Sequence, residues 1–260
     1  MSSSPDSRPL VGRHILICRP EGQDRPLAQH LQSLGGQTYS YAGIRISACA
    51  HSPETRYHLQ HLAQYQWAVF VSRNAVEFGL RASEHFGTWP SQVRCVAIGK
   101  ATALKLEQAG CGPVLRPQGS EDSEGLLQAQ ALQDLEGQRV LIFRGQGGRE
   151  ALAEGLRAAG AIVDYAEVYQ RQAPSEDPGE LRSMVHSHQL SAICAMSSET
   201  LHNVLEAFGL ECLSGLCSIP WLVPHPKIAA VARQAGIQQV IESPGSELEA
   251  VSGALINFFR

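Results

Sequence analysis

The sequence predicts two similar α/β domains, each an open parallel sheet with helices on both faces. Short apolar segments alternate with amphipathic segments along the whole chain, which is the pattern of strands joined by helices. Polar and often glycine-rich turns follow the apolar segments. The second half of the chain repeats the first at a nearly constant spacing, which indicates an internal duplication.

The repeat is clearest in a unit of strand, turn, helix and extended segment. In the second copy we predict a strand at Arg139–Phe143, a helix at Arg149–Ala159 and an extended segment at Ala161–Gln172. In the first copy the strand is His14–Cys18 and the extended segment is Tyr39–Ile46. The copies lie 125 positions apart without a gap, in the pairs Gly12 and Gly137, Arg19 and Arg144, Gly22 and Gly147, Leu27 and Leu152, Leu31 and Leu156, and Gly35 and Gly160.

The remaining elements follow the same alternation. In the first half we predict a helix at Pro53–Gln64, a strand at Trp67–Val71, a helix at Ala75–Glu84, a strand at Val93–Ile98, a helix at Ala103–Ala109, a strand at Pro113–Arg116 and a helix from Glu124 to about Gln133. In the second half we predict strands at Ala192–Met196, Pro220–Val223 and Gln239–Glu242, and a final helix at Glu247–Phe259. Strands alternating with helices in this way favour parallel sheets.

Composition and charge narrow the class of protein. A chain of 260 residues is long enough for two domains, and 43% hydrophobic with 18% charged residues is typical of a globular protein. The net charge of −4 argues against nucleic-acid binding, and no apolar run approaches the ~20 residues of a membrane span. Residues 1–11 are expected to be a disordered tail, because their beginning is rich in serine and proline. The seven scattered cysteines are expected to be reduced thiols of a cytoplasmic protein, and their spacing predicts no metal site.

Polar residues collect where the predicted strands end. Ligands of open parallel sheets bind beyond the carboxyl ends of the strands, and helix N-termini there favour carboxylate or phosphate groups. A large polyanionic ligand would suit such loops. The candidate contacts are Arg19, Ser72, Arg73, Lys100, Thr102, Arg144, Gly145, Ser197, Ser198 and Lys227.

Several segments together resemble the uroporphyrinogen-III synthase family. They are FVSRNAV (70–76), VAIGKATALKL (96–106), SEDSEGLL (120–127), VLIFRGQGGREALAEGLRAAGA (140–161) and EVYQR (167–171), followed by MSSETL (196–201) and VPHPKIA (223–229). The resemblance runs from about Gly12 to Phe259, and it is carried by the order and spacing of the motifs more than by any one of them.

The resemblance implies a fold that the repeat alone does not predict. Members of the family have two flavodoxin-like domains joined by a two-stranded β-ladder. Here the ladder would be residues 39–46 and 165–172, one domain would be 12–38 plus 173–260, and the other would be 47–164. The duplication by itself suggests the alternative of two contiguous halves.

The resemblance also implies an activity. Such an enzyme is a lyase that closes the linear tetrapyrrole hydroxymethylbilane to uroporphyrinogen III, with loss of water and inversion of ring D. It uses no cofactor or metal, and a monomer that binds neither nucleic acid nor membrane is expected. Tyr169 resembles the tyrosine that lines the cleft in the family, and its phenol could assist departure of the hydroxyl.

Each candidate residue also has a structural interpretation. Tyr169 could be a cross-strand packing residue, and Arg19 and Arg144 could form salt bridges within their turns. The hydroxyls of Ser72, Thr102, Ser197 and Ser198 could cap helices, and Lys100 and Lys227 could be solvated surface lysines. The second half has Ile228 where the first has Thr102, which places a side-chain role at that position in doubt.

Two other functions compete with that of a synthase. A nucleotide-binding oxidoreductase needs G-x-G-x-x-G after a strand, but Glu150 stands where the third glycine belongs. A two-lobed noncatalytic binding protein for a polyanionic small molecule shares the predicted architecture, and it remains the alternative at this point.

Overall fold

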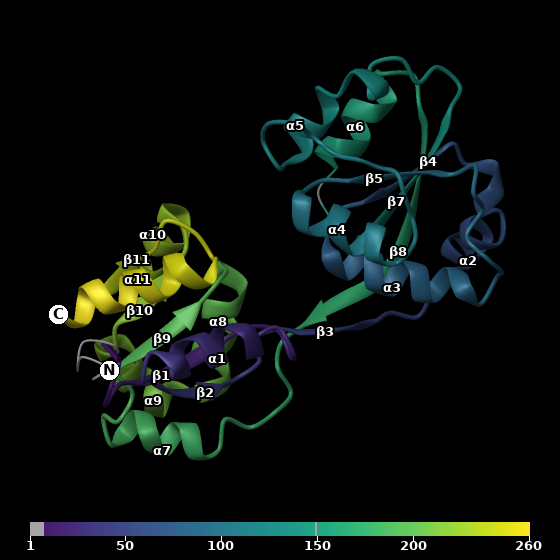
Figure 1. The fold of residues 1–260 in the computed structure, drawn as a ribbon. Helices are drawn as coiled ribbons and strands as arrows, with labels where there is room; N and C mark the ends of the chain where they lie inside the picture. The colour runs from purple at the N-terminus through teal and green to yellow at the C-terminus, as the bar shows by residue number, and fades with distance from the viewer. Residues whose placement is uncertain (1–7, 149) are drawn as a thin grey trace. The chain divides into compact units, whose positions relative to one another are not determined.

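The computed structural model describes residues 8–148 and 150–260, which form two compact units (Figure 1). Unit 1 comprises the residues up to Arg45 together with Gln172–Arg260, and unit 2 comprises Ile46–Arg171. Each unit has its own parallel sheet, so the predicted class of parallel α/β fold is confirmed. Among the described residues, the helices are too short or too polar to cross a membrane.

Unit 1 is a doubly wound sheet of five strands. Their order is β11-β10-β9-β1-β2, and every pair of neighbours is parallel. Counted along the chain within the unit, this is the flavodoxin-like order 2-1-3-4-5. The strands are β1 (His14–Cys18), β2 (Gln37–Ser40), β9 (Ala192–Ala195), β10 (Trp221–Val223) and β11 (Val240–Glu242).

Helices cover both faces of the unit 1 sheet, which is why β1 is apolar on both sides. Leu16 and Cys18 of β1 pack into a cluster with the helices α7, α8 and α9. Ile15 and Ile17 point to the opposite face, toward α1 and α11. The helices of unit 1 are α1 (Arg25–Ser33), α7 (Glu180–His186), α8 (Ser198–Phe208), α9 (Leu210–Ser218), α10 (Pro226–Gln234) and α11 (Leu248–Phe259).

Unit 2 has a six-stranded sheet in the order β3-β8-β7-β4-β5-β6. Without β3, and with β7 counted first, the order is again 2-1-3-4-5. The strands are β3 (Arg45–Ala48), β4 (Trp67–Phe70), β5 (Arg94–Ala97), β6 (Val114–Leu115), β7 (Arg139–Gly145) and β8 (Ile162–Gln172). The helices are α2 (Pro53–Gln60), α3 (Arg73–Glu84), α4 (Lys100–Gln108), α5 (Ser123–Leu127) and α6 (Ala151–Ala158), with 3-10 turns at Leu62–Gln64 and Gln130–Leu132.

The two faces of the unit 2 sheet have separate cores. Phe70 and Phe143 stack with ring centroids 4.5 Å apart on the face covered by α2, α3 and α4. Val69 and Ile142 face α5 and α6 on the other side. Figure 1 shows these two groups of helices on opposite sides of the sheet. Each sheet also combines strands from both halves of the chain, because β1 and β2 lie with β9–β11 while β7 and β8 lie with β4–β6.

The segment Tyr39–Ile46, expected to be a single ladder strand, is divided in the structure. Its beginning belongs to β2, which pairs with β1, and β3 starts at Arg45 in the other sheet. Between them Tyr41 is buried in the unit 1 core, with its ring edge against Phe208. Burial of this large aromatic side chain favours its place in the core, so the part of the segment before β3 belongs to unit 1.

The tail was predicted too long. Its residues 1–7, like Arg149 of the predicted helix Arg149–Ala159, lie outside the described residues. Leu10 is fully buried, and its N–H donates to the Leu34 carbonyl, so the chain is ordered before Gly12. The helices expected at Pro53–Gln64 and at 124–133 each break into a short α-helix and a 3-10 turn, and α7 and α9 were not predicted.

Candidate functional site

The candidate site of unit 2 is a cavity at the carboxyl ends of its strands. Strand order reverses between β7 and β4, and such a switch point is where open α/β sheets bind ligands. The cavity has a volume of about 650 Å³, within the range of small-molecule sites. Its wall combines loop residues after β4, β5, β6 and β7 with residues of β7 and β8 themselves. Among them are Val71, Ile98, Glu121, Arg144, Gly145, Gln146, Tyr165, Tyr169 and Arg171.

Tyr169 is buried in this wall. Its side chain is 2% exposed and its ring stacks on Phe78 at 5.9 Å between centroids. The phenol Oη lies 3.2 Å from the Ser72 Oγ, at the start of α3. The ring therefore packs against helix α3, and its cross-strand neighbour is Gly145 of β7, while its hydroxyl reaches the polar residues at the carboxyl ends of the strands.

An irregularity between β7 and β8 places this ring. Arg144 pairs with Glu167, but the next residue, Gly145, pairs with Tyr169, so Val168 is an extra residue in β8. Bulges of this kind re-aim side chains. Gly145 is required by the close approach, because a Cβ there would lie 2.6 Å from the Tyr169 Cε2.

Arg144 is bound by two carboxylates of the protein. Its Nη1 donates to Glu150 at 2.8 Å and its Nη2 to Glu167 at 3.2 Å, while the guanidinium lies 3.8 Å above the centre of the Tyr165 ring. Hydrogen bonds from Tyr165 and Arg144 hold the pKa of the Glu150 carboxyl below its ordinary value. The salt bridge within the turn, the alternative raised for Arg144, is thus present.

The serines at the helix starts act as caps. Ser72 accepts from the Ala75 N–H at the start of α3, and Ser197 accepts from the Thr200 N–H at the start of α8. Ser72 also contacts Tyr169, so capping and a place at the site are combined in one residue. Thr102 is buried in the first turn of α4.

The remaining predicted residues lie apart from this cluster. Arg73, Lys100 and Lys227 are exposed at the first turns of α3, α4 and α10, as solvated surface cations would be. In unit 1, Arg19 follows β1 and donates to the Ser246 carbonyl at 2.7 Å. Ser198 is half-buried at the start of α8. The structure thus brings together Ser72, Arg144, Gly145 and Tyr169 in unit 2.

Three residues of the site were missed from the sequence. Glu150 and Glu167 compensate Arg144, and Glu121 accepts from the Lys100 N–H at 3.0 Å, at the N-terminus of α4. Glu150 could have been found, because a carboxylate six residues after Arg144 fits the predicted turn. No local sequence pattern marks Glu167 or Glu121 as a site residue. Strand pairing brings Glu167 to Arg144, and a loop brings Glu121 to the Lys100 N–H.

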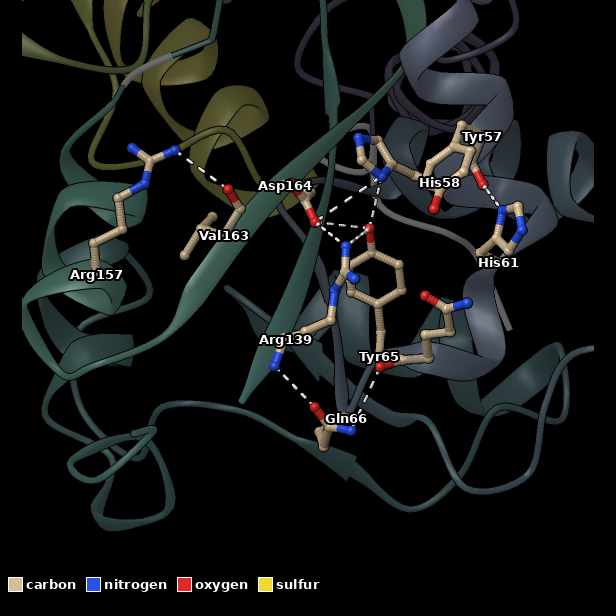
Figure 2. Close-up of polar contacts among 10 residues, drawn as sticks. Tyr57, His58, His61, Tyr65, Gln66, Arg139, Arg157, Val163 and Asp164 are labelled. Atoms are coloured by element: carbon tan, nitrogen blue, oxygen red, sulfur yellow. Dashed lines mark hydrogen bonds and ion pairs between the residues drawn. The ribbon is translucent and has the colours of Figure 1, made fainter. Parts of the chain in front are cut away.

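A second polar cluster lies near the amino ends of the unit 2 strands, opposite to the cavity (Figure 2). It consists of His58, Tyr65, Arg139 and Asp164, and we call it the edge cluster. The Tyr65 hydroxyl donates to Asp164 at 2.8 Å and lies 2.7 Å from the His58 Nδ1, while Arg139 donates to Asp164 at 2.9 Å. These residues belong to α2, the segment before β4, and the amino ends of β7 and β8, away from the carboxyl ends that form the cavity.

The fold and the site define a class of protein: a two-unit, doubly wound α/β protein with polar groups at the carboxyl ends of its strands. Comparison with known protein families identifies the family within this class. The family model described as "Uroporphyrinogen-III synthase HemD" matches residues 25–252, and the chain belongs to this family.

Relatives of known name agree with this assignment. The chain is 32% identical to the uroporphyrinogen-III synthase of Salmonella typhimurium and 30% identical to that of Escherichia coli, each over 93% of this chain and 99% of the relative. Among solved structures, a mutant uroporphyrinogen III synthase of Thermus thermophilus superposes with a TM-score of 0.61, over 95% of this chain and 97% of that one. The uroporphyrinogen-III synthetase of Helicobacter pylori superposes with a TM-score of 0.59, over 95% of this chain and 99% of that one. Both are 16% identical to this chain, so these two matches show likeness of fold.

Proposed function

We propose that this chain catalyses the reaction for which its family is named, the closure of hydroxymethylbilane to uroporphyrinogen III with loss of water and inversion of ring D. The Salmonella typhimurium and Escherichia coli relatives match it over nearly their full length, which supports a shared activity. The observation that carries the proposal in the structure is the Tyr169 phenol, fixed by Ser72, Phe78 and Gly145 in the wall of a polar cavity.

Tyr169 would act as the proton donor. The substrate hydroxyl leaves as water when a proton is added to it, and an azafulvene cation remains. Ser72 Oγ accepts from the Ala75 N–H, so the serine proton is available to donate to the Tyr169 Oη. That bond leaves the phenol proton for the substrate and stabilises the negative charge that develops on the phenol oxygen.

The inversion follows from how the substrate is folded. The cation is attacked at the substituted carbon of ring D, and the resulting spiro intermediate fragments and recloses. This geometry is less accessible in water, where the bilane closes without inversion, so the protein's main task is to hold it. The substrate carries acetate and propionate on every ring, and we propose that Arg19, Ser72, Arg73, Lys100, Thr102, Arg144, Gly145, Ser197, Ser198 and Lys227 contact these groups.

The finer features of the fold support the same proposal. Strands β3 and β8 each cross from one unit to the other by one residue, and they are neighbours in the sheet order. We propose that β3 and β8 form the two-stranded ladder, in place of the predicted residues 39–46 and 165–172, that the units are the two domains, and that both domains arose by duplication. We also propose a cytoplasmic monomer that acts without a cofactor.

The test is to supply purified protein with freshly made hydroxymethylbilane and to separate the product isomers. We expect the inverted isomer from the unmodified chain. Tyr169→Phe should lower turnover by about 10²-fold or less, the lower end of what a positioned proton donor supplies, with the inverted isomer still formed. The control is Tyr57→Phe, which alters an exposed phenol on α2 outside the cavity.

Three outcomes would change the proposal. Full turnover by Tyr169→Phe would show that the phenol is not the acid. A switch to the uninverted isomer would show that the phenol controls the folding of the substrate. Absence of turnover by the unmodified chain, with retained binding of the bilane, would favour a noncatalytic binding protein.

A further inference from the structure

Arg144 is the most enclosed cation of the cavity in unit 2, and its charge is already balanced. Its side chain is 11% exposed and contacts two carboxylates. A buried guanidinium that lost these partners would be strongly destabilising, because an uncompensated charge would remain away from water. A ligand carboxylate can therefore reach Arg144 at low cost by replacing one of the two partners.

The two partners differ in how firmly they are held. Glu167 lies on β8 directly opposite Arg144 in the strand pairing, so its backbone position is set by the sheet. Glu150 lies at the start of α6, after the turn that contains Gly147 in a left-handed conformation (φ 70°). Its side chain is 50% exposed, whereas that of Glu167 is 34% exposed. Glu150 is thus the partner that can leave and be solvated.

Tyr165 helps Arg144 to keep Glu150 in place. The Tyr165 hydroxyl donates to the Glu150 Oε2, and the Tyr165 ring lies beneath the Arg144 guanidinium. Tyr165 and Arg144 also line the cavity. The Tyr165 phenol, the Arg144 guanidinium and the Glu150 carboxylate are therefore in mutual contact beside the cavity. The carboxylate is the more exposed of the two that contact Arg144.

We propose that Glu150 occupies the position on Arg144 that a ligand carboxylate takes, and that Glu150 sets the affinity of this cavity for polyanions by competing with them. The inference rests on the proposed function for the identity of the natural ligand, a polycarboxylate. Glu150 is tethered beside Arg144, so it competes at a high effective concentration. A ligand with one carboxylate is excluded by this competition, whereas a polycarboxylate that gains further contacts displaces Glu150. Glu150 is in this sense a specificity-determining residue.

The test measures binding without turnover. The probe is mellitate, a benzene ring with a carboxylate on every carbon, titrated into the full chain by isothermal calorimetry. Glu150→Gln should lower the Kd by about twofold to fivefold, the range that loss of a half-exposed competing ion pair allows. The matched control is Glu77→Gln, which removes the same charge from the ion pair between Glu77 of α3 and Lys105 of α4, away from this cavity. It should leave the Kd unchanged.

A double-mutant cycle locates the effect. In an Arg144→Gln background, Glu150→Gln should produce no gain over Arg144→Gln itself. Tyr165→Phe removes the hydroxyl that holds Glu150 and keeps the ring, so it should lower the Kd by a smaller factor. If Glu150→Gln fails to fold, Tyr165→Phe replaces it as the variant that tests the inference.

The inference is overturned if mellitate binds Glu150→Gln no more tightly than the unmodified chain, or binds neither. It is also overturned if the gain persists without Arg144, since the effect would then be one of general charge. Because no product is measured, a chain that fails to make uroporphyrinogen III can still show the predicted gain. The failure of one proposal is thereby distinguished from that of the other.

Discussion

At the scale of single residues, Asp164 shows how this protein holds a charge at a sheet edge. Burial would raise the pKa of its carboxyl, but hydrogen bonds from Arg139 and Tyr65 and the charges of His58 and Arg139 outweigh burial and lower the pKa below its ordinary value of 3.8. The Tyr65 hydroxyl has the opposite shift, since burial and the neighbouring Asp164 carboxylate raise its pKa. The edge cluster is therefore built around an ionised Asp164 and a neutral Tyr65.

We expect Asp164→Asn to lower the free energy of unfolding by about 1–2 kcal/mol at neutral pH, because it removes hydrogen bonds to a partly buried charge. The pKa of Asp164 is lower in the folded protein than in the unfolded one, so its contribution is present above about 3.8 and is lost as the pH falls through the folded value. The difference between variant and parent should thus shrink on acidification. Urea unfolding at pH 7 and at about pH 3 measures it, and an equal difference at both pH values would contradict this account.

At the scale of elements, the pairing of β7 with β8 determines the site. The strands are regular from Arg139 to Arg144, and the extra residue Val168 then changes the register at Gly145. The same two strands carry Arg139 and Asp164 of the edge cluster near their amino ends and Arg144 with Tyr169 near their carboxyl ends. The position of the Tyr169 phenol therefore depends on one irregularity at the carboxyl end of an otherwise regular pairing of β7 with β8.

Gly145→Ala should destabilise unit 2 by about 1–3 kcal/mol, because the new Cβ would lie 2.6 Å from the Tyr169 ring and the ring must move. Turnover should fall along with stability. The control is Gly119→Ala, where a Cβ meets nothing within 4 Å. Thermal melts and steady-state kinetics of both variants give the answer. Equal behaviour of the two would mean that Tyr169 does not need this close packing.

At the scale of the whole molecule, each unit has cores of its own. The four hydrophobic clusters of the described residues each draw their members from one unit, two clusters to a unit. Folding cooperativity follows shared core contacts, so two units with separate cores can unfold separately.

We expect calorimetry to show two unfolding transitions. Leu16→Ala removes a fully buried side chain of unit 1 and should lower the midpoint temperature of one transition. Leu141→Ala does the same in unit 2 and should lower the midpoint temperature of the other. Each substitution should cost about 2–5 kcal/mol. A single transition that shifts with both substitutions would show that the units unfold together.

The charge of the molecule gives a second prediction at this scale. The net charge is −4, but Arg73, Lys100 and Lys227 are exposed at strand ends. If they attract a polyanionic substrate, the KM should rise between about 50 mM and 500 mM salt while kcat changes little, since salt screens exposed charges. Steady-state kinetics across this range test it, and a constant KM would exclude a role for these cations.

The sequence by itself determined the parts of the molecule that depend on local pattern. The strand predicted at His14–Cys18 is β1, and the strand predicted at Arg139–Phe143 lies within β7, because an apolar run beside a turn carries its own signal. The parallel α/β class followed from the alternation of such runs with helices, and the family followed from the order of the motifs. Ser72 at a helix start was also predicted, because a cap is a local feature.

The tertiary structure decided which distant residues meet. Tyr41 could have lain in a ladder strand, and only packing against Phe208 of α8 places it in a core. Arg144 could have been open to substrate, but the sheet brings Glu167 beside it and the turn brings Glu150. The contact of Tyr169 with Ser72 joins residues 97 positions apart through a bulge that no local signal announces. The physical reason is that periodicity reports which face of an element is apolar, whereas the partner of a buried charge or hydroxyl is set by strand register and packing between segments far apart in the chain.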